Sequence, residues 1–270
     1  MSDSNATSPA PRLALIGFGE AGEGFASAGH WGGRARGWDI KSDRRELMAR
    51  YGVETANDAR SALEGAGIAI SLVTADAALG AAEECAPLLG KGAIWCDMNS
   101  IAPDTKQAAA KIVEAAGGRY IDVAVMAPVN RDLAVPLLLS GPHSEQAEEL
   151  LRAIGFTNVS IAGDKVGRAS AIKLIRSVMV KGIEALSDEC AAAANAAGVF
   201  DEVVASLDAS EKTIGWADRI AYNLERMHLH GLRRAAEMEE SARTLEALGV
   251  EPLMTRNTAE RQRRAAQTRN

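Results

Sequence analysis

The most informative segment of the chain reads Leu13-Ala14-Leu15-Ile16-Gly17-Phe18-Gly19-Glu20-Ala21-Gly22. Four apolar residues predict a short buried strand, and the G-x-G-x-x-G pattern after them opens a helix predicted over Glu20–Ala28. Gly17 permits a tight turn, Gly19 leaves the backbone bare where a pyrophosphate approaches, and the helix N-terminus supplies N–H donors. The segment predicts a dinucleotide-binding turn, and a glycine-rich turn without a ligand is the alternative. The predicted cofactor contacts are Gly17, Phe18, Gly19, Glu20, Ala21 and Gly22.

An acidic residue follows the second predicted strand, Ala35–Trp38, about 20 residues after the glycine turn. A carboxylate at Asp39 can accept hydrogen bonds from both ribose hydroxyls of adenosine and would repel a 2′-phosphate. The sequence therefore favours NAD over NADP as the cofactor. Three basic residues just beyond it, Lys41, Arg44 and Arg45, leave the opposite preference open, because they can hold a phosphate.

Around these residues, short apolar runs alternate with helical stretches, which is typical of βαβ units that build a parallel sheet. Further strands are predicted at 68–73, 93–96, 120–125 and 136–140, and helices at 44–51, 77–89 and 103–116. After Gly163 the strand signals nearly stop, and helix-forming residues dominate 169–197 and 214–248. We expect a disordered lead-in over 1–11, an α/β Rossmann domain over 12–163 and an all-α domain over 164–270.

Composition limits the kinds of partner. The chain of 270 residues is 47% hydrophobic and 24% charged, which excludes disorder throughout, and it lacks an apolar run of membrane-spanning length. A net charge of −6 and 4% aromatic residues disfavour nucleic-acid binding. Cys85, Cys96 and Cys190 form no C-x-x-C pair, so we expect reduced packing cysteines and no metal site. Met1–Pro11 lacks the features of a secretory signal, so we expect a cytoplasmic protein with a small-molecule partner.

Three further segments carry a family resemblance together with the glycine turn. They are Asp97-Met98-Asn99-Ser100-Ile101-Ala102-Pro103, Asp122–Pro128 and Gly167–Lys173. They are similar to the D-x-S-T-x-x-P loop, the substrate loop and the glycine-to-lysine helix start of the β-hydroxyacid dehydrogenase family, relatives of 6-phosphogluconate and 3-hydroxyisobutyrate dehydrogenases. The stretch His228–Arg256 resembles a variant branch with its own helical C-terminal domain. The resemblance implies hydride transfer between NAD(P) and a small hydroxy acid, alcohol or carbonyl compound, by a homodimer joined through the helical domain.

The resemblance also implies that Lys173 is the catalytic lysine. Hydride transfer leaves negative charge on a carbonyl oxygen, and a positioned ammonium stabilises that charge before it transfers a proton. Without the family, a lysine on a solvated helix face would be the favoured interpretation. Two rival functions stay open: an imine reductase on the same scaffold, which often lacks this lysine, and a regulatory protein that binds the dinucleotide without turnover.

Asn99 and Ser100 follow a predicted strand at the carboxyl edge of the sheet, where such ligands bind, so we expect them at the nicotinamide and the substrate carbonyl. Ser100 stands where the family has Thr, and its hydroxyl can still donate. It can also act as the N-cap of the helix that begins near Pro103. We further predict cofactor contacts from Val73 and Thr74.

Three departures from the family bear on the substrate. Met126-Ala127-Pro128 replaces S-G-G, which removes a hydroxyl and an amide donor, so we expect a larger or less polar substrate. Ser177 replaces an Asn four residues after the lysine, and a second family lysine falls at Ala236. Arg176, His228, His230, Arg233 and Arg234 are possible replacements, with isolated surface residues as the alternative. The predicted substrate-binding residues are Ser100, Met126, Ala127, Arg176, Ser177 and His230.

Overall fold

The computed structural model describes residues 12–129, 132–210 and 213–267, and the predicted disordered lead-in over 1–11 lies outside them. The chain divides into two compact units, of which the first ends at Arg176 and the second begins at Ser177. The division falls inside the long helix α7 (Arg168–Ala197). The sequence places its domain boundary earlier, between residues 163 and 164, where the strands end.

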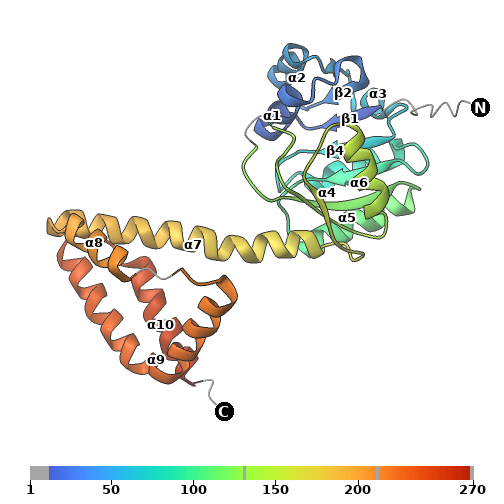
Figure 1. Cartoon of the computed structure of the whole chain (residues 1–270). Helices are drawn as coiled ribbons and strands as arrows, with labels where there is room; N and C mark the ends of the chain where they lie inside the picture. The colour runs from blue at the N-terminus through green and yellow to red at the C-terminus, as the bar shows by residue number, and fades with distance from the viewer. Residues whose placement is uncertain (1–11, 130–131, 211–212, 268–270) are drawn as a thin grey trace, which may run out of the picture. The chain divides into compact units, whose positions relative to one another are not determined.

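The first unit contains one eight-stranded sheet with the order β3-β2-β1-β4-β5-β6-β7-β8. Strands β1, β2 and β4 are labelled in Figure 1. Neighbouring strands are parallel except β6 and β7. From β1 the chain moves outward to β2 and β3 and then returns to place β4 on the other side of β1, which makes the carboxyl ends of β1 and β4 a topological switch point. The strands are β1 (Leu13–Ile16), β2 (Ala35–Trp38), β3 (Glu54–Thr55), β4 (Ile68–Ser71), β5 (Ile94–Asp97), β6 (Arg119–Val125), β7 (Leu137–Ser140) and β8 (Val159–Gly163).

Helices cover both faces of this sheet, and each face has its own apolar core. Leu13 and Leu15 of β1 belong to one core, whereas Ala14 and Ile16 belong to the other, because side chains alternate along a strand. Helices α1, α2 and α6 contribute to the first core and α3, α4 and α5 to the second. The helices are α1 (Glu20–Gly29), α2 (Ser42–Met48), α3 (Ala59–Leu63), α4 (Ala78–Cys85), α5 (Pro103–Ala115) and α6 (Ser144–Ala153), with 3-10 turns η1 (Gly32–Arg34), η2 (Ala49–Tyr51) and η3 (Ala86–Leu88).

The predicted α/β Rossmann domain followed by an all-α domain is confirmed, with one correction to the sheet. Strand β7 runs antiparallel to β6, whereas the sequence pattern indicated a parallel sheet. The described residues between these strands, 126–129 and 132–136, form no helix. Parallel neighbours need a crossover connection, usually helical, while antiparallel neighbours do not, so the shorter connection accounts for the reversal.

The second unit consists of helices. It contains the part of α7 from Ser177 onward, α8 (Phe200–Ser210), α9 (Trp216–Ala247) and α10 (Leu253–Gln267). Helices α9 and α10 pack side by side, and Gly231 lies so close to the Gln262 carbonyl that a Cβ atom there would clash (Figure 1). No helix among the described residues has the length and apolar character needed to cross a membrane.

One buried carboxylate joins α7 to the start of α10. Glu189 accepts hydrogen bonds from the amides of Met254 (2.7 Å) and Thr255 (2.9 Å) and from the Thr255 hydroxyl. Burial acts to raise the pKa of Glu189, but these hydrogen bonds outweigh it and hold the pKa below its usual value. The negative charge at a helix N-terminus fixes α10 against α7.

The prediction that all three cysteines are packing residues is confirmed only in part. Cys85 and Cys96 are buried, and burial followed by the charge of Glu84 raises the pKa of Cys85 to about 12. Cys190 is exposed, so the prediction is wrong for this residue. The sequence did not reveal this because the α7 face that carries Cys190 is rich in alanine, and small residues serve equally in a core or on a surface.

Candidate functional site

The glycine turn joins β1 to α1 at the switch point of the sheet. Gly17 has φ +88°, and a Cβ atom there would lie 2.7 Å from the Leu72 carbonyl oxygen, so only glycine fits. At Gly19, apart from the residue itself and its two chain neighbours, no heavy atom of the described residues lies within 4 Å of an added Cβ position. The first turn of α1 closes with the Glu23 amide donating to the Gly19 carbonyl, so the amides of Glu20, Ala21 and Gly22 precede the helix ladder. This open space lined with donors fits a pyrophosphate.

Asp39 follows β2 and points toward the glycine turn. One carboxylate oxygen accepts the Phe18 amide at 2.7 Å and the other accepts the Lys41 amide at 2.9 Å. A carboxylate has about four acceptor positions, so these two bonds leave capacity for ribose hydroxyls. The Arg45 guanidinium donates to the Asp39 carbonyl at 2.7 Å and lies over the Trp38 ring, while Arg44 pairs with Asp43 at 3.7 Å. Both arginines thus already contact neighbouring residues of their own segment.

A cavity of about 360 Å³ lies beside the glycine turn. Its lining comes from α1, from the residues after β4 and β5, from the end of β6 and the residues after it, and from α7, all within the first unit. The carboxyl edge of the sheet therefore brings together five residues that the sequence analysis assigned to cofactor, substrate and catalysis. The lining residues are Glu20, Ala21, Leu72, Met98, Ser100, Val125, Ala127, Pro128, Val129 and Lys173.

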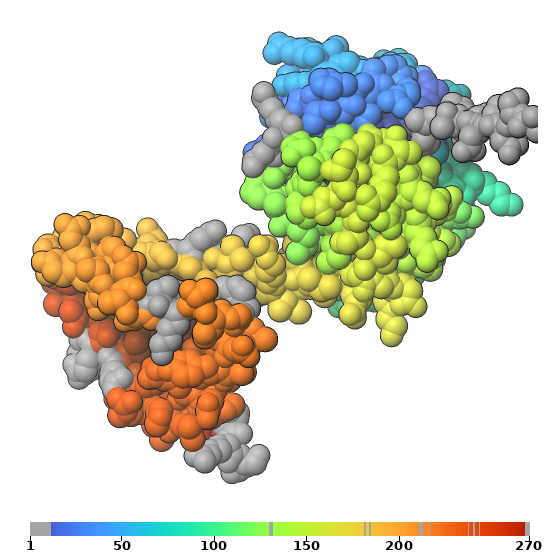
Figure 2. Space-filling model, viewed as in Figure 1, coloured from blue at the N-terminus to red at the C-terminus, as the bar shows by residue number. Residues whose placement is uncertain are grey.

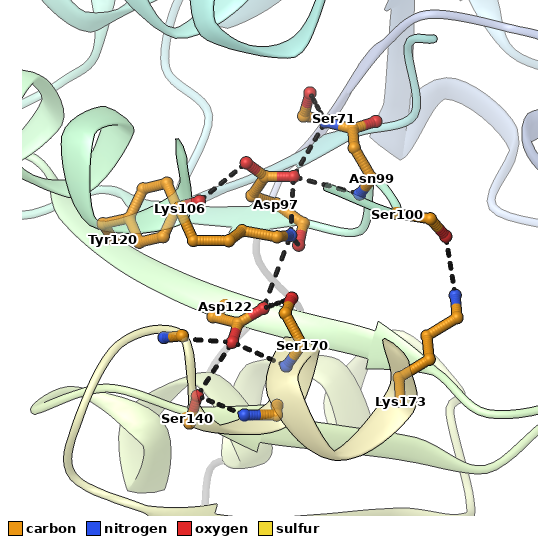
Figure 3. Close-up of polar contacts among 12 residues, drawn as sticks. Ser71, Asp97, Asn99, Ser100, Lys106, Tyr120, Asp122, Ser140, Ser170 and Lys173 are labelled. Carbon is orange, nitrogen blue, oxygen red and sulfur yellow. Dashed lines mark hydrogen bonds and ion pairs between the residues drawn. The ribbon is translucent and has the colours of Figure 1, made fainter. Parts of the chain in front are cut away.

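Lys173 and Ser100 meet at this cavity. The Lys173 ammonium donates a hydrogen bond to the Ser100 hydroxyl oxygen at 2.8 Å (Figure 3). The N-cap of α5 is Ala102, without a side-chain capping bond, so the alternative that Ser100 caps this helix is wrong. An ammonium and a hydroxyl side by side are two donors that can meet one substrate oxygen.

Asn99 lies behind Ser100 and is held in place from two sides. Its side-chain NH₂ donates to the Ser71 hydroxyl at 2.9 Å and to Asp97 at 2.8 Å. Its side-chain oxygen is buried and has no hydrogen-bond partner among the described residues. Because buried acceptors are almost always paired in native proteins, this oxygen fits a hydroxyl or amide donor from a ligand, as a nicotinamide nucleoside would supply.

A buried polar network that the sequence analysis missed lies beneath these residues (Figure 3). Lys106 has no exposed surface and contacts both Asp97, at 2.9 Å, and Asp122, at 3.4 Å. Asp122 in turn accepts hydrogen bonds from Ser140 and Ser170. The available signal was a carboxylate inside the otherwise apolar run of β6, since an aspartate there needs buried partners.

Tyr120 closes the network on one side by donating its hydroxyl proton to Asp97 at 2.6 Å. Burial, followed by the nearby Asp97 and Asp122 carboxylates, raises the pKa of Tyr120 far above its usual value. The phenol therefore stays protonated and acts as a donor.

Several other residues that the sequence analysis predicted for the site are not among those that line the cavity. Val73 and Thr74 are the second and third residues after β4, with Val73 half-buried and Thr74 exposed. The Met126 amide donates to the Pro136 carbonyl at 2.9 Å, so that donor is engaged. Arg176 is exposed on α7, and Ser177 and His230 belong to the second unit, where His230 is exposed on α9. In the part of the chain that the structure describes, no cluster of three His, Cys, Asp or Glu side chains is arranged to hold a metal ion.

Two family models match the chain. The model for the NAD binding domain of 6-phosphogluconate dehydrogenase matches residues 12–163, and a domain of unknown function, DUF1932, matches residues 194–265. The first match covers more than half of the chain, and the second lies in the helical unit.

Solved structures agree with these matches. A conserved hypothetical protein from Sinorhizobium meliloti is 34% identical, with 97% of this chain and 91% of that one covered and a TM-score of 0.64. A conserved protein of unknown function, described as similar to 3-hydroxyacid dehydrogenases, is 27% identical over 95% and 98%, with a TM-score of 0.63. The imine reductase from Myxococcus stipitatus in complex with NADP⁺ is 19% identical over 96% and 95%, with a TM-score of 0.79, and a variant of it is in complex with NAD⁺. At that identity the likeness shows the fold alone.

Proposed function

The chain belongs to the family of the NAD binding domain of 6-phosphogluconate dehydrogenase, and on this basis we propose that it is an NAD(P)-dependent dehydrogenase or reductase that acts on a CH–OH group or the corresponding carbonyl. The observation that carries the proposal is the hydrogen bond between Lys173 and Ser100 in a cavity that the glycine turn also lines. The substrate class is a small hydroxy acid, alcohol or carbonyl compound.

Each residue has a distinct part in this proposal. The amides of Glu20 and Ala21 would hold the pyrophosphate, and Asp39 would accept the ribose hydroxyls. The bound nicotinamide supplies hydride chemistry. The Lys173 ammonium donates to the substrate oxygen, stabilises its developing negative charge and gives up a proton during carbonyl reduction. In the oxidative direction the neutral amine accepts that proton. Ser100 orients the lysine and offers its own hydroxyl proton to the same oxygen.

Cofactor preference gives a first testable result. Because Asp39 would accept the ribose hydroxyls and would repel a 2′-phosphate, we expect NADH to bind at least about tenfold more tightly than NADPH, a difference of about 1.4 kcal/mol. Asp39→Ala should narrow this gap in a calorimetric titration. Lys41→Ala is the comparison variant. Suppose instead that the wild type binds NADH and NADPH equally and that Lys41→Ala weakens the binding of NADPH. That result would show that the basic residues beyond Asp39 govern the cofactor preference.

Substrate preference is tested by the rate of NADH oxidation against matched carbonyls and imines. The engaged Met126 amide and the missing donor at Pro128 leave the loop after β6 with little means of binding a carboxylate. We expect bulky aryl or alkyl carbonyls to react faster than short acids, and Arg176→Ala to raise KM mainly for acidic substrates. Faster turnover of imines would favour the imine reductase. Binding of NADH without turnover of any compound would favour the regulatory protein.

We also propose a homodimer formed through the helical unit. Many large apolar side chains of this unit are exposed, and isolated soluble chains rarely present so many. They include Val178, Met179, Val180, Ile183 and Leu186 of α7, Leu207 of α8, and Ile220, Leu224, Leu229 and Leu232 of α9. Sedimentation equilibrium tests this directly, and a monomer at micromolar concentration would contradict it.

A further inference from the structure

Lys106 is an unusual residue to find at its position. It lies close to the N-terminus of α5 and has no exposed surface. Lysine is almost never fully buried without a partner, and the helix dipole disfavours a cation near a helix N-terminus. Two buried carboxylates offset both effects. The ammonium donates to the Asp97 carboxylate at 2.9 Å and to the Asp97 carbonyl at 2.6 Å, and Asp122 lies at 3.4 Å.

On one side, this ammonium fixes the loop that carries Ser100. The Asp97 oxygen that contacts Lys106 also accepts the Asn99 amide at 3.0 Å and the Asn99 side-chain NH₂ at 2.8 Å. Tyr120 donates to the second Asp97 oxygen at 2.6 Å. Asp97 thus sets the conformation of the residues immediately before Ser100.

On the other side, the ammonium faces the carboxylate that caps the helix of Lys173. Asp122 accepts the backbone amides of Gly167 at 3.1 Å and Ser170 at 3.0 Å, and the Ser170 hydroxyl at 2.6 Å. These groups form the N-terminus of α7, and Ser170 precedes Lys173 by three residues, about one helical turn. Asp122 therefore anchors the turn from which Lys173 extends, and Gly167 packs tightly on Pro103 at the start of α5.

We propose that Lys106 is a positioning residue, whose buried charge holds Asp97 and Asp122 together and so fixes the distance between Ser100 and Lys173. Its ammonium contacts Asp97 and Asp122, and through these two carboxylates it acts on the positions of Ser100 and Lys173 (Figure 3). Removing Lys106 would leave two buried carboxylates side by side without the positive charge that offsets their repulsion. This repulsion would separate the loop after β5, which carries Ser100, from the start of α7. The inference rests on the proposed function for the role of Lys173, although the geometry that it concerns can be measured without turnover.

The test compares Lys106→Met with the wild type by two readouts. The first is steady-state reduction of the best carbonyl from the panel, for which we expect kcat to fall by roughly tenfold or more while the Kd for NADH changes little, because small misplacements of a catalytic group are costly. The second is acetylation of Lys173 by isotope-labelled acetic anhydride, measured by mass spectrometry against exposed Lys111 in the same sample. We expect faster acetylation of Lys173 once its contact with Ser100 loosens.

Val113→Ala is the matched control, because Val113 is buried on the same helix outside the polar network. It should lower the melting temperature but leave kcat and Lys173 acetylation at their wild-type values. If Lys106→Met does not fold, Asp122→Asn decides the matter, since it leaves Lys106 paired with Asp97 but removes the charge through which Lys106 holds the carboxylate that caps α7. The proposal would be overturned if a folded Lys106→Met kept the wild-type kcat and the wild-type rate of Lys173 acetylation. If Lys106→Met does not fold, the same two results in Asp122→Asn would overturn it.

The two readouts separate this inference from the proposed function. If the wild type turns over no compound of the panel, the proposed function fails, yet faster Lys173 acetylation in Lys106→Met would still support the positioning role. If the wild type is active and the variants keep both wild-type values, the positioning role alone fails.

Discussion

Replacing Lys173 by methionine should lower kcat for carbonyl reduction by roughly 100-fold or more, the range that a positioned general acid contributes. Methionine retains much of the length and apolar volume of lysine but cannot donate to the substrate oxygen or to Ser100. The pyrophosphate donors lie on the glycine turn, so the affinity for NADH should hardly change. Stopped-flow and steady-state NADH oxidation measure the rate, and calorimetry measures the binding.

Lys165→Met is the appropriate control for this substitution. Lys165 is exposed in the turn just before α7 and does not line the cavity, so its loss should leave kcat unchanged. Equal circular dichroism and melting temperatures would establish that Lys173→Met is folded. Wild-type turnover in a folded Lys173→Met would contradict the role assigned to this lysine.

Replacing Gly19 by valine should strongly weaken dinucleotide binding while the protein stays folded. The backbone at Gly19 is extended, with φ −76° and ψ −160°, and the space in front of its missing Cβ is open within the described part of the chain. Valine therefore fits the free protein and occupies the volume that a pyrophosphate needs. We expect the Kd for NADH to rise by roughly 100-fold or more, corresponding to about 2.7 kcal/mol or more. Calorimetry and thermal melting provide the two measurements.

Gly33→Val is the matched control, because an added Cβ at Gly33 also meets open space and Gly33 lies in η1, before β2. Both variants should melt close to the wild type, and only Gly19→Val should bind NADH more weakly. Unchanged NADH affinity in Gly19→Val would place the dinucleotide elsewhere on the protein.

The sequence predicted the parts of the fold that rest on apolar patterning. Strands β1 and β2 have the bounds expected from it, and for β1 the reason is a run of four buried apolar residues directly before the glycine turn. It did not predict β3, which has two exposed residues, or α3, which has five residues, since neither carries enough apolar pattern to stand out. Helix α6 was missed as well, although it packs on the first core with Ala147 and Leu151; its segment forms part of the yellow-green surface in Figure 2.

The residues of the candidate site that belong to sequence motifs could be predicted from the sequence. The buried charged residues that hold them in place could not. The glycine turn, Ser100 and Lys173 came from motifs, and the fold places Glu20, Ala21, Ser100 and Lys173 around one cavity. Lys106 was passed over because a lysine on an amphipathic helix is usually on its solvated face. Only tertiary contacts reveal that Asp97 and Asp122 lie beside it, because paired strands β5 and β6 set these two residues opposite one another. The assignments of Ser177 and His230 stay predictions.

The most direct test of the proposed reaction site is a crystal structure of the protein with bound NADH. We predict the pyrophosphate on the amides of Glu20 and Ala21, and the nicotinamide ring in the cavity that Ser100 and Lys173 line, with space for a small carbonyl between the ring and the ammonium. A nicotinamide ring bound away from Lys173, or a dinucleotide bound anywhere other than the glycine turn, would contradict this prediction.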